Sequence, residues 1–413
     1  MRIVADERMN GLEELIRPLG ELITAPGREI DRHLLADADV LLVRSITPVS
    51  ATLLKDSPLR FVGTATSGLD HIDQAFLSAQ GIALADARGS NANAVVDYVL
   101  AALAELIVDG ELDVRDLTVG IVGHGQVGSR LQSRLAALGI GTRVCDPPLA
   151  AWLRGSHVPE RAASLVSLSE VLACQVVSVH VPLQHGGEQA TASLFDRSTL
   201  ATLGPQRWLI NTSRGGIVDE AAWLELHGQA RAPRLISDVW CNEPHVDERL
   251  VRAARLATPH IAGYSERAKR QATAMLAEAL QQFQQGSFAG QTRKTNGPQP
   301  TSGSSAALSS PVDHWRRLTD VLPLAPLSER FKQAVTAAGG EGLSAATFDG
   351  FRNDLRKRRE FAELAVAALA GNSERKMEEG KMEERIDAVT GQSSQLEFFR
   401  VGFFQSLIQP GGL

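Results

Sequence analysis

The sequence predicts an α/β protein with two doubly wound parallel-sheet domains and a small α+β domain at the C-terminal end. Three observations predict this fold class. Short apolar runs alternate with helical patterns over the first 285 residues, 413 residues are too many for one core, and the composition shifts near residue 286. With 44% hydrophobic and 22% charged residues, most of the chain is expected to fold.

The first α/β run extends over residues 1–95. Its expected strands are residues 2–6, 39–45, 60–66 and 81–87, with a helix at residues 71–80. These strands read as continuous runs of Val, Ile and Leu, which is typical of parallel strands buried on both faces. We expect a substrate-binding lid domain here, completed by a helix within residues 265–285.

The second run follows a helix at residues 91–106 and is expected to form a Rossmann-like nucleotide-binding domain over residues 96–264. Its expected strands are residues 117–123, 142–146, 176–182, 207–213 and 235–240, and each ends in polar residues or glycine. Ligands of open parallel sheets bind at the carboxyl ends of the strands. We therefore expect the functional residues at these ends.

The C-terminal third has a different composition. Residues 286–310 are rich in Gly, Ser, Pro and Thr and are predicted to be a linker. Residues 311–413 form the expected C-terminal domain, in which residues 347–371 give the clearest helical pattern and residues 373–387 are densely charged.

Charge and cysteine content exclude several classes of function. The net charge of -6 disfavours nucleic acid and anionic membranes as partners. The N-terminus lacks the apolar run of a secretory signal and no apolar stretch reaches membrane-spanning length, so a cytoplasmic protein is expected. Cys145, Cys174 and Cys241 are too widely spaced to predict a metal site or a disulfide framework.

A glycine-rich loop predicts a dinucleotide site. Gly123, Gly125 and Gly128 fit the spacing G-x-G-x-x-G between an expected strand and a helix, and Gln126 and Val127 lie between the last two glycines. Glycines permit a tight turn and a close approach of backbone to a pyrophosphate, which would meet the free N–H groups of the helix start. An ordinary turn between a strand and a helix is the alternative.

Asp146 predicts NAD as the cofactor. It ends the next expected strand, about 20 residues beyond the glycines, where a carboxylate can accept hydrogen bonds from both ribose hydroxyls. The carboxylate would repel the 2′-phosphate of NADP, and Pro147 and Pro148 supply no basic group to receive one. Alternatively, Asp146 only caps the following helix.

Three polar residues just past strand ends form a candidate catalytic group: Arg214, Glu243 and His260. Oxidation of a 2-hydroxy acid requires a base for the hydroxyl proton, and histidine suits this role near neutral pH. Glu243 would orient His260 and stabilise its imidazolium form, while Arg214 would bind the substrate carboxylate with its forked guanidinium group.

The motifs GIVGHGQVG, HVPL, INTSRGGIVDE, DVWCNEP and TPHIAGYS resemble those of the D-2-hydroxyacid dehydrogenases over residues 1 to about 285. The resemblance implies that Arg214, Glu243 and His260 are catalytic and that His260 transfers the proton. It also implies that further residues line the cofactor, namely Val181, Thr212, Ser213, Asp238 and Gly263. Asp97 stands where much of that family has Glu.

A closer resemblance is to the branch of this family that oxidises 4-phosphoerythronate in vitamin B6 synthesis, and VCDPP and HIAGY are its most specific motifs. It implies that Ser45, Thr66 and Tyr264 contact the substrate and that residues 311–413 form a homodimer. Arg44, at a strand end, is a candidate phosphate ligand or else a surface arginine. Arg352 is a candidate to reach the partner's active site, whereas residues 371–413 match this branch poorly.

Two alternative functions remain at this point. The same three catalytic residues would serve a relative acting on 3-phosphoglycerate, glycerate or hydroxypyruvate. A non-catalytic NAD-sensing corepressor could share the fold, since fold does not determine function.

Overall fold

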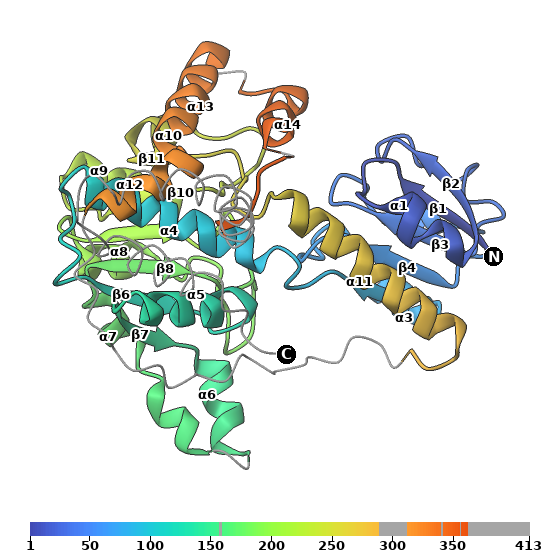
Figure 1. Cartoon of the computed structure of the whole chain (residues 1–413), viewed down its shortest axis with the longest axis horizontal. Helices are drawn as coiled ribbons and strands as arrows, with labels where there is room; N and C mark the ends of the chain where they lie inside the picture. The colour runs from blue at the N-terminus through green and yellow to red at the C-terminus, as the bar shows by residue number, and fades with distance from the viewer. Residues whose placement is uncertain (157–158, 289–311, 340–341, 356, 362–413) are drawn as a thin grey trace, which may run out of the picture. The chain divides into compact units, whose positions relative to one another are not determined.

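The computed structural model describes residues 1–156, 159–288, 312–339, 342–355 and 357–361, which divide into two compact units (Figure 1). The described residues of the first unit are 1–95, 263–288, 355, 357 and 358, and those of the second are the remainder. The chain leaves the first unit between Val95 and Val96, inside α4 (Ala92–Val108), and returns between Ala262 and Gly263.

The first unit contains a five-stranded parallel sheet in the order β2-β1-β3-β4-β5. The strands are β1 (Arg2–Asp6), β2 (Glu21–Ala25), β3 (Val40–Val43), β4 (Phe61–Thr64) and β5 (Ala83–Asp86). Four of them confirm the sequence prediction, but β2 was not predicted. It is an edge strand whose residues are only partly buried, so it lacks the continuous apolar run that identified the other strands.

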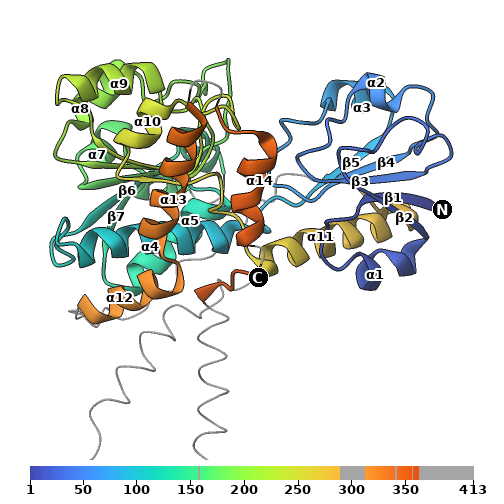
Figure 2. The ribbon, with the colours of Figure 1, turned by 90° about the horizontal axis from the view of Figure 1, so that it is seen from above.

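Helices cover both faces of this sheet. The short elements between strands are α1 (Leu12–Leu15), η1 (Arg17–Leu19), α2 (Ala51–Leu54) and α3 (Gln74–Ala79). The long helix α11 (Glu266–Gln284) also lies against the sheet (Figure 2). Its Leu276 and Leu280 pack in one cluster with Ile3, Leu42 and Phe61. The sequence prediction that this helix returns to the first domain is confirmed.

The second unit contains a six-stranded parallel sheet in the order β11-β10-β9-β8-β6-β7. The strands are β6 (Thr118–Val122), β7 (Gly141–Cys145), β8 (Val176–Val179), β9 (Trp208–Asn211), β10 (Arg234–Ser237) and β11 (Leu256–Ala257). From β6 the chain forms β7 on one side and then β8 on the other. The strand order therefore reverses at β6, the position where doubly wound folds bind nucleotides.

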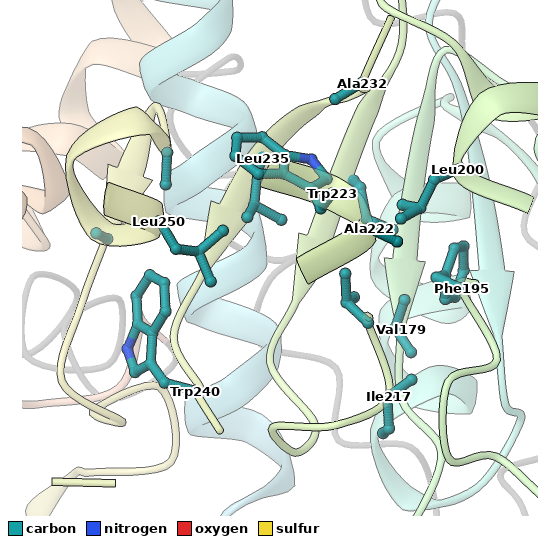
Figure 3. Packing of buried hydrophobic residues seen from close by; sticks show 14 of the residues in the cluster. Val179, Phe195, Leu200, Ile217, Ala222, Trp223, Ala232, Leu235, Trp240 and Leu250 are labelled. Atoms are coloured by element: carbon teal, nitrogen blue, oxygen red, sulfur yellow. The ribbon is translucent and has the colours of Figure 1, made fainter. Parts of the chain in front are cut away.

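The helices of this sheet are α5 (Gln126–Ala137), α6 (Pro147–Arg154), η2 (Pro159–Ser164), α7 (Leu168–Leu172), α8 (Arg197–Leu203), α9 (Glu220–Gly228) and α10 (Glu248–Ala253). Figure 3 shows part of the packing on one face, where Trp223 of α9 and Leu250 of α10 lie in one cluster with the strand residues Val179 and Leu235. The buried indole of Trp223 donates a hydrogen bond to the Pro233 carbonyl at 3.0 Å, so its polar atom is satisfied.

The described C-terminal residues also belong to the second unit. They form α12 (Val312–Val321), α13 (Leu324–Ala338) and α14 (Ala345–Asp354). Helix α13 packs on β11 and α10, and its Phe331 meets the rings of Phe348 and Phe351 on α14, which lies beside it (Figure 2). A separate dimerisation domain over residues 311–413 stays a prediction, and the β part of that α+β expectation is not among the described residues.

The predicted helix at residues 347–371 is corrected in its described part, since α14 ends at Asp354. The following backbone makes tertiary hydrogen bonds instead: Arg358 O accepts from Glu266 N at 3.0 Å, and Phe361 N donates to the Asp97 carboxylate at 2.8 Å. Most of the predicted linker and the tail at residues 371–413 lie outside the described residues. Within the described ranges, no helix is long and apolar enough to span a membrane.

Candidate active site

The register of the second sheet aligns the ends of its strands. The paired residues are Val122 with Cys145 and Val179, Asn211 with Val179 and Ser237, and Ser237 with Ala257. The loops after these residues therefore leave the sheet at one edge. This edge carries most of the residues that the sequence singled out.

The glycine loop follows β6 and has the geometry of a dinucleotide cradle. Gly123 has φ +93°, and a Cβ there would lie 2.5 Å from the His180 carbonyl oxygen. A Cβ at Gly128 would collide with the Gly123 carbonyl, whereas one at Gly125 would meet nothing within 4 Å. Gly125 caps α5 without a side chain, so the N–H groups of the first turn can meet an anionic pyrophosphate.

The two residues after Gly125 support this helix start. The Gln126 side chain and carbonyl accept hydrogen bonds from Arg130 at 2.5 and 2.6 Å, and Val127 is half-buried. Leu131 and Leu135 of the same helix are fully buried. The loop thus fits NAD by its shape and its free donors.

Asp146 lies after β7 and does cap the next helix, as the alternative interpretation stated. Its Oδ1 accepts from Leu149 N at 2.9 Å at the start of α6, and its Oδ2 accepts from His124 N at 2.8 Å in the glycine loop. Each carboxylate oxygen can accept a further hydrogen bond. The cap is therefore compatible with the predicted ribose contact, which stays a prediction.

The loops after β8 and β9 pack together beside Gly123. The Ser213 hydroxyl donates to the Val179 carbonyl at 2.5 Å, and the Thr212 hydroxyl lies 3.5 Å from His180 Nδ1. Val181 lies against Gly123. Burial lowers the pKa of His180 to about 3, so this imidazole is neutral at physiological pH.

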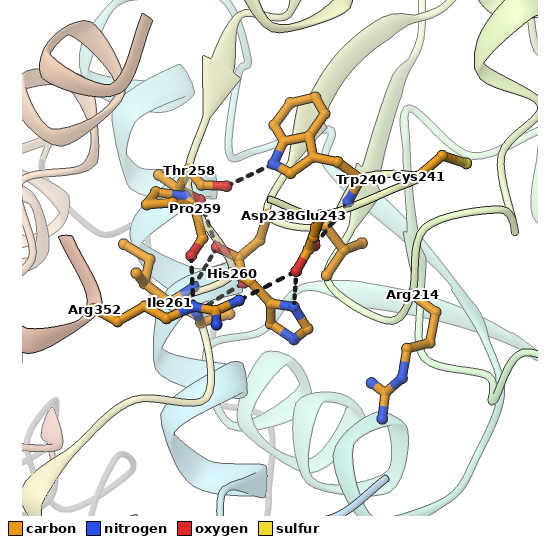
Figure 4. Close-up of polar contacts among 12 residues, drawn as sticks. Arg214, Asp238, Trp240, Cys241, Glu243, Thr258, Pro259, His260, Ile261 and Arg352 are labelled. Carbon is orange, nitrogen blue, oxygen red and sulfur yellow. Dashed lines mark hydrogen bonds and ion pairs between the residues drawn. The ribbon is translucent and has the colours of Figure 1, made fainter. Parts of the chain in front are cut away.

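Arg214 comes from the loop that follows β9. Arg214 Nη1 donates to the Ser213 carbonyl at 2.7 Å. The backbone carbonyl of Arg214 accepts from Asn211 Nδ2 at 3.1 Å. A Cβ at Gly215 would collide with the Trp240 carbonyl, so this loop packs directly on the one that carries Glu243. Figure 4 shows Arg214 to one side of the pair formed by Glu243 and His260.

Glu243 and His260 are joined by a hydrogen bond of 2.8 Å between Oε2 and Nδ1 (Figure 4). Burial raises the pKa of Glu243, but the charge of His260, its hydrogen bond and the charge of Arg352 outweigh burial, so the pKa lies below its usual value. Because Glu243 is then ionised and can only accept, Nδ1 carries a proton and Nε2 is left as the acceptor. This is the arrangement of a general base.

Asp238 fixes the loop that carries His260. Its carboxylate is fully buried and accepts from the Thr258 hydroxyl at 2.6 Å and from the backbone N–H groups of Ile261 and Ala262 at 2.8 Å each. His260 has φ +58°, a strained value for a residue other than glycine. The hydrogen bonds to Asp238 hold the backbone in this conformation.

The first unit carries the remaining predicted residues, and two of them follow β3. Arg44 Nε donates to the fully buried Asp6 at 2.9 Å, while Arg44 Nη2 is buried without a hydrogen-bond partner among the described residues. Arg44 is thus more than a surface arginine. Ser45 is exposed at the same end of the sheet.

In this unit, Thr66 follows β4 and Tyr264 precedes α11. The Thr66 hydroxyl lies 2.8 Å from both the Thr64 hydroxyl and the Gly68 carbonyl, just beyond β4. The Tyr264 ring holds the Lys269 ammonium group 4.5 Å from its centroid. Gly263 packs on Asn91 so closely that a Cβ would collide with its amide.

One supporting residue, Glu220, was not among the predicted site residues. Glu220 accepts from Cys241 N at 2.7 Å and so holds the loop before Glu243, and burial raises the pKa of Glu220. Glu220 belongs to the quoted motif INTSRGGIVDE, so the signal was present in the sequence. Arg352 contacts Glu243 of its own chain at 3.1 Å, whereas the predicted contact with a partner subunit stays untested.

The comparisons with known proteins agree with this geometry. Residues 107–262 match the family model for the NAD-binding domain of D-isomer specific 2-hydroxyacid dehydrogenases. NAD-bound 3-phosphoglycerate dehydrogenase of Entamoeba histolytica shares the fold with a TM-score of 0.58 and 23% identity, over 71% of this chain and 99% of that one. The chain is thus an NAD-dependent dehydrogenase of the D-2-hydroxyacid class.

More similar relatives define a narrower group. Erythronate-4-phosphate dehydrogenase of Pseudomonas fluorescens is 44% identical over 68% of this chain and 73% of that protein. The enzyme of the same name from Marinobacter nauticus is 39% identical over 90% of this chain and 96% of that protein. The chain belongs to the erythronate-4-phosphate dehydrogenase family.

Proposed function

We propose that this enzyme oxidises 4-phospho-D-erythronate to (R)-3-hydroxy-2-oxo-4-phosphooxybutanoate with NAD, as a step of vitamin B6 synthesis. The observation that carries the proposed chemistry is the hydrogen bond between His260 Nδ1 and Glu243 Oε2, which leaves Nε2 as the proton acceptor. The names of relatives that are 39–46% identical support the choice of substrate.

The proposed reaction uses His260 as the base. As the C2 hydroxyl is oxidised, its proton passes to His260 Nε2 and Glu243 stabilises the imidazolium that forms. NAD, when bound, accepts the hydride from C2. Arg214 binds the substrate carboxylate, for which its planar guanidinium group is suited.

Four residues of the first unit are proposed as substrate contacts. Arg44 is the phosphate ligand, supported by its buried Nη2, which has no hydrogen-bond partner among the described residues, and by Asp6, which fixes Nε at 2.9 Å. A phosphate oxygen would satisfy a donor that is otherwise costly to bury. Ser45, Thr66 and Tyr264 are the proposed neighbouring contacts.

The proposed NAD contacts lie at the edge of the second sheet. The glycine loop receives the pyrophosphate and Asp146 receives the ribose hydroxyls. The residues proposed to line the cofactor are Gly123, Gly125, Gln126, Val127, Gly128, Asp146, Val181, Thr212, Ser213, Asp238 and Gly263. We further propose that the enzyme acts in the cytoplasm as a homodimer formed through its C-terminal region.

The test is turnover of the purified protein with 4-phospho-D-erythronate, 3-phospho-D-glycerate and D-glycerate. Reduced nicotinamide is followed, and a 2-oxo acid is supplied as an alternative oxidant in case bound NADH does not leave. Selective reaction with phosphoerythronate that is lost in His260→Ala is the expected result. Reaction only with another acid would overturn the proposed substrate, and NAD binding without turnover of any of the three would favour an NAD sensor.

A further inference from the structure

We propose that Arg352 of α14 is a positioning residue for the catalytic pair, and that its charge limits how strongly Glu243 favours the imidazolium form of His260. This inference rests on the proposed oxidation, in which His260 must be neutral to accept a proton. It assigns a function to a helix that lies outside the residues matched by the dehydrogenase family model.

Arg352 contacts Glu243 and the residue that precedes His260 (Figure 4). Arg352 Nη2 donates to Glu243 Oε2 at 3.1 Å, the same oxygen that accepts from His260 Nδ1 at 2.8 Å. Arg352 Nε donates to the Pro259 carbonyl at 3.1 Å, directly before His260. One guanidinium group therefore fixes the carboxylate and the strained backbone of the base together.

Helix α14 holds Arg352 in place for this role. The guanidinium group lies 4.6 Å from the centroid of the Phe348 ring, and Phe348 packs on Phe331 of α13. Only 15% of the Arg352 side chain is exposed, so solvent screens its charge less than that of a surface arginine. Asp349 also approaches Nη1 at 3.5 Å, which restrains the other side of the group.

The electrostatic consequence follows from the shared oxygen. An isolated Glu243 carboxylate would favour the imidazolium strongly and leave less neutral His260 at moderate pH. The Arg352 charge offsets part of the carboxylate charge and also repels the imidazolium directly. Both effects favour the neutral form that the oxidation needs.

Other charged groups around the pair are fixed by their own partners. Asp238 faces His260 from the end of β10, and Glu220 faces Glu243 from α9. Neither is in hydrogen-bond contact with Arg352 in the described contacts, so a substitution of Arg352 leaves their hydrogen bonds in place. A change in pH dependence can then be assigned to Arg352 itself.

The test is the pH profile of kcat/KM for the full-length enzyme and three variants. Arg352→Gln removes the charge and is expected to move the acid limb upward by about one pH unit, with kcat reduced at every pH. Arg352→Lys keeps the charge but not the forked donors, so its acid limb stays in place while kcat falls. Arg330→Gln is the matched control, since Arg330 on α13 also lies over an aromatic ring of α14, that of Phe351 at 5.6 Å, but has no described hydrogen bond to Glu243 or His260.

An unmoved acid limb in Arg352→Gln, or an equal movement in Arg330→Gln, would overturn the proposal. Thermal unfolding reports whether the variants fold. If Arg352→Gln does not fold, Arg352→Met is used in its place, because its aliphatic side chain can still pack on Phe348. If the wild type turns over none of the acids tested, the proposed function fails by itself. In that case the ring signals of His260, identified by their loss in His260→Ala, are followed by NMR as the pH changes. Arg352→Gln must raise the pH at which these signals change.

Discussion

Glu243 orients the His260 ring through the 2.8 Å hydrogen bond between His260 Nδ1 and Glu243 Oε2. The two residues lie on different loops and are 17 positions apart in the sequence. Glu243 is in turn fixed by Trp240 N, which donates to Oε1 at 3.0 Å. Trp240 thus holds Glu243 in place, and Glu243 holds the His260 ring. This geometry leaves His260 Nε2 as the proton acceptor.

Replacement of Glu243 by glutamine is expected to lower kcat by about 100-fold or more while the protein stays folded. The glutamine amide can donate to Nδ1, which would place the imidazole proton on Nε2 and remove the acceptor that the substrate needs. The measurements are kcat, KM and thermal unfolding of Glu243→Gln, compared with wild type.

The control is the double variant with His260→Ala. If the two residues act as a unit, the loss in the double variant will be close to that of His260→Ala alone. A kcat within threefold of wild type in Glu243→Gln, or fully additive losses, would contradict a coupled pair.

The sequence predicted the residues of this site better than it predicted their supports. Strand ends in a parallel sheet converge, so Arg214, Glu243 and His260 could be placed at one edge from the chain alone. Asp238 was expected to line the cofactor, which stays a prediction, whereas the hydrogen bonds of its carboxylate to the loop at residues 258–262 were not foreseen. Such a role depends on backbone geometry, which no residue pattern encodes.

The fold shows the same division. Strands buried on both faces were visible as apolar runs, whereas the edge strand β2 was missed because its residues are partly exposed. Arg352 was predicted as a contact to the active site of a partner subunit, and its contact with Glu243 of its own chain was not predicted. Its contact with Glu243 spans 109 positions, and a contact of that range depends on how α13 and α14 pack on the sheet.

Asp238 is expected to control both activity and the pH dependence of stability. In Asp238→Asn one amide hydrogen would face a backbone N–H of Ile261 or Ala262, so the loop loses a hydrogen bond and His260 loses its fixed backbone. We expect kcat to fall at least tenfold. A variant with unchanged kcat would show that the loop needs no such anchor.

The stability effect has a defined sign. Burial raises the pKa of Asp238 to about 6, whereas an aspartate in an unfolded chain has a pKa of about 3.9. The folded state binds this proton more tightly, so the stabilisation is complete below about pH 4 and is lost as the pH rises through 6. Between pH 4.5 and 7 the wild type should lose about 2 kcal/mol of unfolding free energy relative to Asp238→Asn, measured by urea denaturation.

Asp146 is expected to select NAD over NADP through its charge. Asp146→Asn keeps an oxygen that can accept from Leu149 N and so preserves the cap of α6, but it removes the charge that repels a 2′-phosphate. The ratio of kcat/KM for NAD to that for NADP should fall about tenfold or more. An unchanged ratio with the helix intact would mean that selectivity comes from another group.

Arg44 is expected to recognise the substrate phosphate. In Arg44→Gln the guanidinium group with its buried Nη2 is lost, and KM for phosphoerythronate should rise by about 10- to 100-fold because a charge-assisted contact is removed. Unphosphorylated D-erythronate makes no such contact, so its kcat/KM should be nearly the same in the variant and the wild type.

Arg88→Gln provides a matched control in the same unit. Arg88 also pairs with an aspartate at a strand end, Asp86 at 2.6 Å, but half of its side chain is exposed. Its loss should leave KM for phosphoerythronate within about twofold of wild type, as is usual for an exposed pair. Equal increases of KM in both variants, or an equal loss with D-erythronate in Arg44→Gln, would show that Arg44 maintains the structure of the unit and does not bind phosphate.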